Sequence, residues 1–175
     1  MNKFKKVYYV LIRQIIKKID CFNPRLYMKF YVQYLKKIGI DLYGIPRFIH
    51  PSVNFDGKGY SKTHIGENVV ISRDVLFLNH DYSINCGLRT IGKNKKHEAY
   101  WLNDIYIGNN VFIGARVSIL PGTKIGDNCI IGTGSVIKGN IPNNSILFGN
   151  PANIVAKTDE WAKKKMKISN YFFED

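Results

Sequence analysis

The sequence of 175 residues has few cysteines and no long apolar run. Its three cysteines, Cys21, Cys86 and Cys129, are odd in number and show no C-x-x-C spacing, which argues against a disulfide framework and a structural zinc site. No apolar stretch approaches the ~20 residues needed to span a bilayer. The basic start leads into an apolar run that Arg13 interrupts, so no signal peptide is predicted and we expect a cytoplasmic protein.

Acidic residues are also scarce, with 13 Asp and Glu against 26 Lys and Arg, for a net charge of +13. The excess is concentrated at one end, because residues 1–44 contain ten Lys or Arg and two Asp, a net charge of +8. Such a field attracts nucleic acid, anionic lipid and polyanionic small molecules. No helix-turn-helix, zinc-finger or RNP-like pattern accompanies it, so nucleic acid is not an expected partner.

Residues 1–44 are predicted to be helical. Apolar residues recur at three- and four-residue steps from Phe4 to Ile19 and from Leu26 to Ile38, and Asn23-Pro24 separates the two runs. Two compatible interpretations stay open. Either the apolar faces pack on the rest of the protein and the lysines are solvated, or the segment makes a peripheral contact with an anionic membrane.

From Ile49 onward the period becomes six. Glycine often follows the leading aliphatic residue, and a small or β-branched residue comes four positions after it. This period is typical of short strands joined by tight turns, with three hexads in each triangular coil. The glycines are expected where the chain turns sharply or takes a positive φ. The leading residues, expected to stack inside the coils, are Ile65, Ile71, Phe77, Ile107, Ile113, Ile119, Ile125, Ile131 and Ile137.

The predicted architecture is therefore mainly β: residues 1–44 form the helical segment, residues 45–157 the coils, and residues 158–175 a helical tail. Open coil ends invite edge pairing, so the N-terminal helices and the tail after Pro151 are expected to cover them. Thr158 is the predicted N-cap of a short helix through Lys167.

A loop over residues 81–104 interrupts the hexads for 24 residues, after which they resume in phase. Compact solenoids rarely carry so long an excursion without a use for it. His80 stands where the coils give way to the loop. The residues predicted here to contact a substrate are Asn79, Asp81, Tyr82, Arg89, His97 and Trp101.

Several ordered motifs over residues 49–157 resemble the hexapeptide-repeat acetyltransferases, especially the capsule, exopolysaccharide, maltose and galactoside O-acetyltransferases. The resemblance implies a left-handed parallel β-helix, a homotrimer, and acetyl-CoA in a groove between neighbouring coils with the loop arching over the active site. The matching segments are Phe77-Leu78-Asn79-His80-Asp81-Tyr82-Ser83, Ile107 to Gly114, Ile119 to Gly126, Gly132 to Ile137, and Phe148-Gly149-Asn150-Pro151-Ala152.

The resemblance also implies that His80 deprotonates an acceptor hydroxyl, which attacks the thioester directly. An imidazole near its own pKa suits this task and contributes ~10²–10⁴ in rate. Asp81 or a backbone carbonyl is expected to hold the other ring nitrogen. His50 is predicted to be structural or exposed, and His64 to have no chemical role.

The cofactor contacts implied by the resemblance are less regular. The family often has a basic residue directly after the Gly-Asn-Pro-Ala segment, where this chain has Asn153, and a lysine at the position of Gly139. Lys124 is an additional candidate for the phosphates, and no metal is expected. The predicted acetyl-CoA contacts are Gly114, Ala115, Gly132, Thr133, Lys138, Asn150, Pro151 and Lys157.

The predicted function is acetyl-CoA-dependent O-acetylation of a saccharide in surface-polysaccharide assembly. The acceptor could be a free, nucleotide-linked or lipid-linked sugar, and the protein is placed in the cytoplasm or at the inner face of the membrane. An alternative is N-acetylation of an amino sugar nucleotide on the same scaffold. A different class is a non-catalytic scaffold bound to membrane. A zinc carbonic anhydrase would need three converging histidines, and the chain has no H-x4-H pair.

Overall fold

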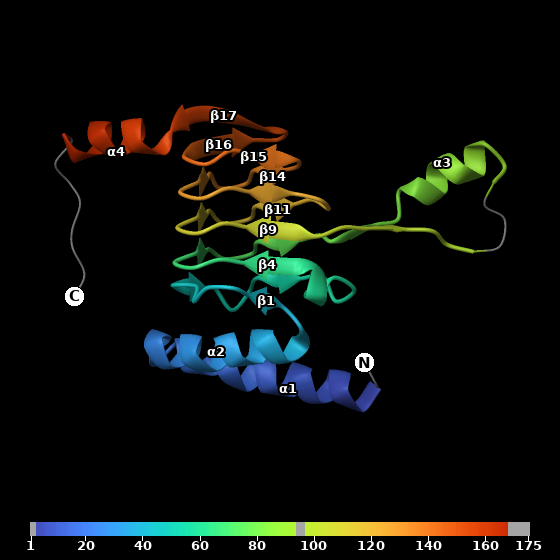
Figure 1. The fold of residues 1–175 in the computed structure, drawn as a ribbon. Helices are drawn as coiled ribbons and strands as arrows, with labels where there is room; N and C mark the ends of the chain where they lie inside the picture. Colours follow the sequence, from blue (N-terminus) through green and yellow to red (C-terminus); the bar gives the residue numbers. More distant parts are fainter. Residues whose placement is uncertain (1–2, 94–96, 168–175) are drawn as a thin grey trace.

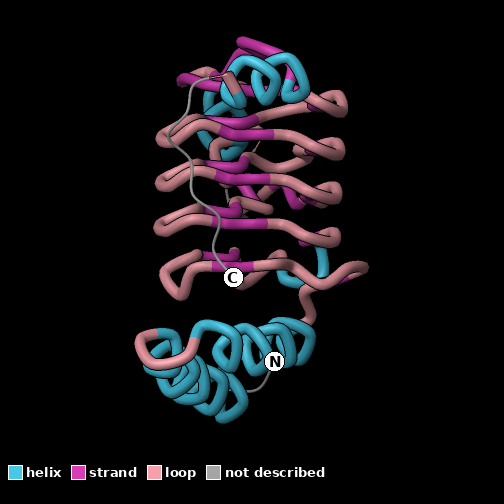
Figure 2. The backbone as a smooth tube through the Cα atoms, turned by 90° about the vertical axis from the view of Figure 1, so that its left-hand side faces the viewer, coloured by secondary structure: helices cyan, strands magenta, loops and turns pink. Residues whose placement is uncertain are grey.

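The computed structural model describes residues 3–93 and 97–167, in which short parallel strands wind into a stack of triangular coils (Figures 1 and 2). The first four coils each give one strand to each of three sheets, and the last turn gives only β15 and β16. The first sheet has the order β1-β4-β9-β12-β15, the second β17-β16-β13-β10-β5-β2, and the third β14-β11-β6-β3. The coil strands are β1 (Asp41–Leu42), β2 (Phe48–Ile49), β3 (Asn54–Phe55), β4 (Thr63–Ile65), β5 (Val70–Ile71), β6 (Leu76–Phe77), β9 (Ile105–Ile107), β10 (Phe112–Ile113), β11 (Ser118–Ile119), β12 (Lys124–Ile125), β13 (Ile130–Ile131), β14 (Val136–Ile137), β15 (Asn140–Ile141) and β16 (Ser145–Gly149).

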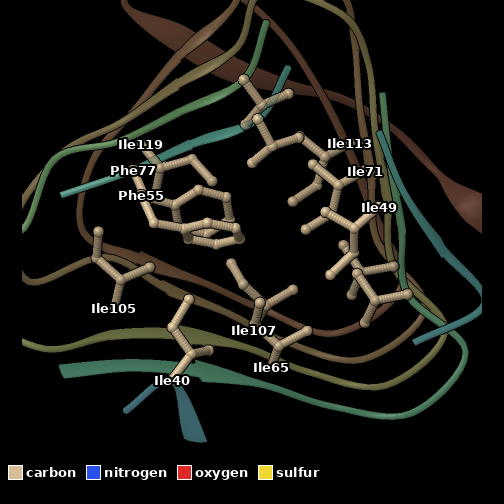
Figure 3. Close-up of a cluster of buried hydrophobic side chains, with 14 of the residues drawn as sticks. Ile40, Ile49, Phe55, Ile65, Ile71, Phe77, Ile105, Ile107, Ile113 and Ile119 are labelled. Carbon is tan, nitrogen blue, oxygen red and sulfur yellow. The ribbon is translucent and has the colours of Figure 1, made fainter. Parts of the chain in front are cut away.

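The core is a set of aliphatic and aromatic ladders that run along the stack (Figure 3). The register pairs Ile65 with Ile107 in the first sheet, and the rings of Phe55 and Phe77 stack 4.7 Å apart in the third. All nine predicted leading residues are at most 3% exposed. Full burial of such a side chain stabilises by about 1.5–3 kcal/mol. The six-residue period therefore predicted the coils correctly.

The glycines that follow the leading residues serve a purpose other than the one predicted. Positive φ angles fall elsewhere in the corners, so left-handed backbone does not explain these glycines. They are needed because the next coil comes too close for a side chain. A Cβ on Gly108 would lie 2.8 Å from the carbonyl carbon of Gly126, and one on Gly114 would lie 2.7 Å from the backbone nitrogen of Thr133.

Asparagine supplies the positive φ at the corner between the first and second sheets. Asn68, Asn110, Asn128 and Asn144 have φ of 55°, 53°, 56° and 58°. Asparagine tolerates this region better than most residues. Their side-chain amides form a ladder along the corner, with hydrogen bonds of 3.1, 2.8 and 3.0 Å. The ladder joins successive coils on the outside as the aliphatic residues do inside.

Two helices, α1 (Lys3–Asp20) and α2 (Pro24–Ile38), cover the first coil as predicted (Figure 1). Asn23 caps α2 by accepting a hydrogen bond from Leu26 N. Tyr27 is fully buried, and its hydroxyl donates to Ile49 O over 2.7 Å, which fixes α2 to the coil. One basic residue of α1 also reaches the coils, because the guanidinium of Arg13 donates to Val53 O over 2.7 Å.

At the other end of the stack, a strand covers the last coil. β17 (Ala152–Lys157) turns back antiparallel on β16, whereas α4 (Thr158–Met166) projects away from the coils and buries no residue (Figure 1). Thr158 is not the N-cap that the sequence predicted, because its hydroxyl donates to Asn128 O over 2.8 Å. Residues 168–175 of the predicted helical tail lie outside the described residues.

Substitution Gly108→Ala should destabilise the stack by about 1–3 kcal/mol, because the new methyl group meets backbone of the next coil. The matched control is Gly87→Ala, where a Cβ would meet nothing within 4 Å and φ is not positive. Urea unfolding followed by circular dichroism measures both. An unchanged midpoint for Gly108→Ala would contradict the close-approach explanation.

Candidate active site

The predicted loop is an arm rather than a lid. β7 (His80–Asp81) pairs antiparallel with β8 (Trp101–Leu102), and between them the chain carries α3 (Ile84–Thr90). The arm leaves the stack between β6 of the third sheet and β9 of the first, and it extends away from the coils (Figure 1). Within one chain it does not arch over the coils, so a loop that covers the active site stays a prediction for the assembled trimer.

Asn79 fastens the neck of the arm, the place near Asn79 and Asn103 where the chain leaves and rejoins the coils. It is fully buried, and its side-chain nitrogen donates to Lys62 O over 2.9 Å and to Asn103 O over 3.1 Å. Its side-chain oxygen accepts from the Thr63 hydroxyl over 3.0 Å, and Asn103 N donates back to Asn79 O over 2.9 Å. With no exposed surface, Asn79 cannot contact an acceptor, and the prediction that it does so is corrected to a structural role.

His80 lies above Asp56, which directly follows β3 of the coil below. Asp56 Oδ2 accepts hydrogen bonds from His80 Nδ1, from His80 N over 2.9 Å and from Asn79 N over 3.2 Å. Its side chain is 5% exposed, against 26% for His80. A carboxylate at Nδ1 selects the tautomer that carries the proton there, which leaves Nε2 as the basic nitrogen.

The environment keeps Asp56 ionised. Burial would raise the pKa of its carboxyl, but the hydrogen bonds from the His80 side chain and from the backbone N–H groups of Lys58 and His80 outweigh burial and hold the pKa below its usual range. A fixed negative charge therefore lies beneath the ring of His80. Sequence analysis missed Asp56.

Asp81, the predicted partner of the ring, faces away from it. Side chains alternate along a strand, so Asp81 and its cross-strand partner Trp101 lie on the opposite face of the β7–β8 ribbon from His80. Asp81 Oδ1 instead accepts from Ser83 N over 2.7 Å, and this bond lowers the pKa of Asp81. The prediction that Asp81 holds the imidazole is wrong.

Two tyrosines and a lysine form a wall beside His80. The ring centroids of Tyr82 and Tyr100 lie 5.3 and 6.3 Å from that of His80. Lys58 Nζ stands 4.6 Å from the centroid of Tyr82 and 4.3 Å from that of Tyr100, and its hydrogen bond to the Tyr82 hydroxyl raises the pKa of Lys58. Tyr82 was predicted here. Tyr100 was not among the predicted contacts, but strand alternation explains its position. It stands two residues before Leu102, the cross-strand partner of His80, and therefore lies on the same face as His80.

The other predicted substrate contacts do not reach His80. Arg89 lies on α3 and pairs with Glu98 at 2.5 Å, far along the arm. His97 is exposed on the same outer part. Trp101 is 55% exposed on the far face of the ribbon. Any contact of these three with a substrate of His80 would have to involve another copy of the chain.

Most of the predicted cofactor residues gather along the corner between the second and third sheets. Gly114, Ala115 and Thr133 line a cavity of about 460 Å³ there. Gly132 belongs to the same corner, one residue after β13. Asn150 and Pro151 form the turn of the β16–β17 hairpin next to it, since Gly149 N donates to Ser135 Oγ over 3.1 Å.

The two predicted cofactor lysines lie apart from this cavity. Lys138 follows β14 at the corner that carries the arm, and Lys157 ends β17 beside the asparagine ladder. Lys124 is turned toward the ring of Tyr106, 5.5 Å from its centroid. The cation in the cavity is Arg73, which sequence analysis missed, and His50 lines it too.

His64 has more partners than the sequence suggested. Its Nδ1 lies 2.8 Å from Asp41 Oδ2, its Nε2 lies 3.1 Å from Asp104 Oδ1, and its ring stacks on Tyr106 at 4.2 Å. Hydrogen bonds from His64 and Lys62 lower the pKa of Asp104. This network ties Asp104, the last residue of the arm, to two lower coils. Among the described residues, no group of three or more His, Cys, Asp or Glu is placed to hold a metal ion.

Comparisons with known proteins identify the family. Residues 104–139 match the family described as bacterial transferase hexapeptide (six repeats). The galactoside O-acetyltransferase of Escherichia coli (strain K12) is 36% identical over 143 residues, which cover 73% of this chain and 66% of the relative. That of Lactococcus lactis (strain IL1403) is 28% identical over 152 residues, covering 79% and 70%. The chain belongs to the hexapeptide-repeat acetyltransferase family.

Solved structures show the same left-handed parallel β-helix. A maltose O-acetyltransferase from Clostridium difficile 630 has a TM-score of 0.55 at 23% identity, covering 86% of this chain and 88% of that one. A galactoside acetyltransferase in complex with coenzyme A has a TM-score of 0.57 at 23% identity, covering 96% and 86%. Among curated relatives, the match spans 54% of the Bacillus subtilis (strain 168) protein YvoF and 66% of the Escherichia coli protein.

Substitution Asp56→Asn should cost about 2 kcal/mol of stability at neutral pH, because it removes a buried charged acceptor. The folded pKa of Asp56 lies below the ordinary value near 4, so its contribution is present above pH ~4 and is lost as the pH falls through the folded pKa. Urea unfolding at several pH values should therefore show the two proteins converging in acid. The control Asp159→Asn alters an exposed pair at 3.5 Å and should change little at any pH.

Proposed function

We propose that the protein is an acetyl-CoA-dependent O-acetyltransferase that acts on a sugar hydroxyl. The observation that carries this proposal is the His80–Asp56 pair, which leaves Nε2 basic beside the wall of Tyr82 and Tyr100. Aromatic faces suit the apolar side of a sugar ring, and the names of the curated relatives from Escherichia coli and Lactococcus lactis specify galactoside O-acetylation.

The proposed reaction is a single displacement with His80 as general base. Nε2 takes the proton of the acceptor hydroxyl as its oxygen attacks the thioester carbonyl carbon. The tetrahedral oxyanion collapses, the carbon–sulfur bond breaks, and the imidazolium returns the proton to the departing sulfur of CoA. Asp56 supports the imidazolium between the two proton transfers and holds the ring in place.

A homotrimer is part of the proposal, because one subunit holds the two halves of the site apart. His80 stands beyond one edge of the third sheet, whereas the cavity of Gly114, Ala115 and Thr133 lies at the other edge. In a ring of three copies, the cavity edge of one subunit would face His80 of the next. The extended arm suits such an assembly, since it reaches beyond its own coils (Figure 1).

We place this reaction in surface-polysaccharide assembly on the cytoplasmic side of the membrane. N-acetylation of an amino sugar nucleotide stays the alternative, because Nε2 could equally accept a proton from an ammonium or amine. Mass spectrometry of the product before and after mild base separates the two: an ester is hydrolysed, whereas an amide persists. An amide product would mean that the acceptor is an amino sugar rather than a sugar hydroxyl, with acetyl-CoA still the donor.

Substitution His80→Ala should lower kcat/KM for CoA release by about 10²–10⁴ without unfolding the protein, since it removes the base. Thiol release from acetyl-CoA with a panel of saccharides measures it. The matched control is His64→Asn, which changes a histidine on the first sheet and should keep near-normal activity per folded molecule. Full activity of His80→Ala would contradict the mechanism, and the lack of thiol release by the unmodified protein would favour a non-catalytic scaffold.

Substitution Arg73→Gln should raise KM for acetyl-CoA about ten-fold with little change in kcat, because the guanidinium is the cation of the cavity beside Gly114 and Thr133. Lys157→Gln should leave KM nearly unchanged, since Lys157 lies at another corner. Steady-state kinetics with varied acetyl-CoA test both substitutions. If Lys157→Gln raised KM for acetyl-CoA and Arg73→Gln did not, Lys157 would be the phosphate contact, as the sequence analysis predicted.

A further inference from the structure

The helix pair presents an apolar face that the fold does not use. On α1, helical periodicity places Tyr9, Ile12, Ile16 and Ile19 toward α2 and the coils. A second apolar row of α1 lies on the opposite side. This outer face, as we define it, comprises Val7, Tyr8, Val10, Leu11 and Ile15 of α1, Phe22 of the interhelical turn, and Leu26 and Phe30 of α2, which are 42–89% exposed.

The outer face lies at the end of the stack, away from the arm and from α4. Both views place the helix pair below the first coil, with α1 as the outermost element and its axis across the stack (Figures 1 and 2). Large apolar side chains exposed together on one helix pair are typical of an interaction site. No helix in the described part of the chain is both long and apolar enough to cross a membrane.

Exposed cations lie on both helices that carry the outer face, and two of them, Lys29 and Lys36, also line the groove between α2 and the coils. Lys18, Lys29, Lys36 and Lys37 are exposed on the two helices, and none of them takes part in a salt bridge within the described residues. Asp20 is the only acid among residues 1–40. An apolar row bordered by lysines, with tyrosine and phenylalanine among the apolar residues, is the composition of helices that lie in a membrane interface.

We propose that the outer face docks on an anionic lipid bilayer. Charge decides between this partner and a second copy of the chain, because a second copy would oppose lysine to lysine, whereas an anionic surface attracts each of them. The apolar side chains enter the boundary between head groups and acyl chains. The coils then stand upright on the membrane, since α1 lies across the stack axis (Figure 1).

Docking in this orientation brings the candidate active site close to the bilayer. A cavity of about 400 Å³ lies between α1 and the turn after β3, and its lining includes Val10 of the outer face, Arg13, Lys58 and Asp56. The residue that holds His80 thus shares a cavity with a residue that contacts lipid. If the proposed function holds, an acceptor carried on a lipid would meet two cations on its way to His80.

Co-sedimentation of the full chain with vesicles tests docking independently of catalysis. Phosphatidylcholine vesicles should bind little, vesicles that also contain phosphatidylglycerol should bind well, and salt should weaken the binding. Lys18→Gln/Lys29→Gln/Lys37→Gln should weaken binding about five-fold for each charge removed. The double substitution Leu11→Ser/Ile15→Ser should weaken it about ten-fold or more, because the apolar insertion is lost.

The matched control is Lys163→Gln/Lys164→Gln/Lys165→Gln, which removes the same charge from exposed positions on α4 at the opposite end of the stack. It should bind like the unmodified protein, and circular dichroism should show every variant folded. Equal loss in the control, or equal binding to both kinds of vesicle, would overturn the proposal. The proposal would also be overturned if Leu11→Ser/Ile15→Ser made the protein dissociate into single subunits without lipid. That result would mean that the outer face is a contact between copies of this chain.

Discussion

Successive coils must lie about 4.8 Å apart for their backbones to form hydrogen bonds, and the remaining features of this structure depend on that spacing. The bond from Gly66 N to Ile107 O, 2.9 Å long, is one rung of the resulting ladder. At that distance every side chain lies on its equivalent one coil away. Aliphatic residues therefore form ladders inside and asparagines form one outside, while the tightest corner positions exclude any Cβ.

The candidate site exists because an insertion can leave this ladder without breaking it. β6 and β11 pair in register although the whole arm separates them in sequence, and so do β4 and β9. The neck closes through Asn79 and Asn103, which spares the coils the cost of unpaired backbone groups. His80 is thereby held between a rigid coil below, which supplies Asp56, and the base of the arm, which supplies the tyrosines.

The sequence predicted the features that repeat along the chain, but it missed contacts between residues from different coils. A fixed period identified the buried ladders, and the break in it identified His80. Asp56 could not be found this way, because it stands 24 residues earlier, in a coil whose hexads are weak. Asp81 was a predicted partner of the imidazole because it is next to His80 in the sequence, yet adjacent residues of a strand point to opposite faces. Likewise, Lys138 and Lys157 were chosen from the motifs, yet within one subunit each lies at a different corner of the triangle from the cavity of Arg73.

The triangular cross-section also constrains how a whole enzyme could be assembled. Donor and acceptor must meet at one carbon, yet the cavity with Arg73 and the imidazole of His80 lie at two edges of the third sheet. Copies related by a three-fold axis parallel to the stack would join these edges, and they would also bring three outer faces into one plane. In such a trimer, binding of one outer face would hold the other two near the bilayer, so the proposed docking of one helix pair would be strengthened about as much as linked binding sites allow.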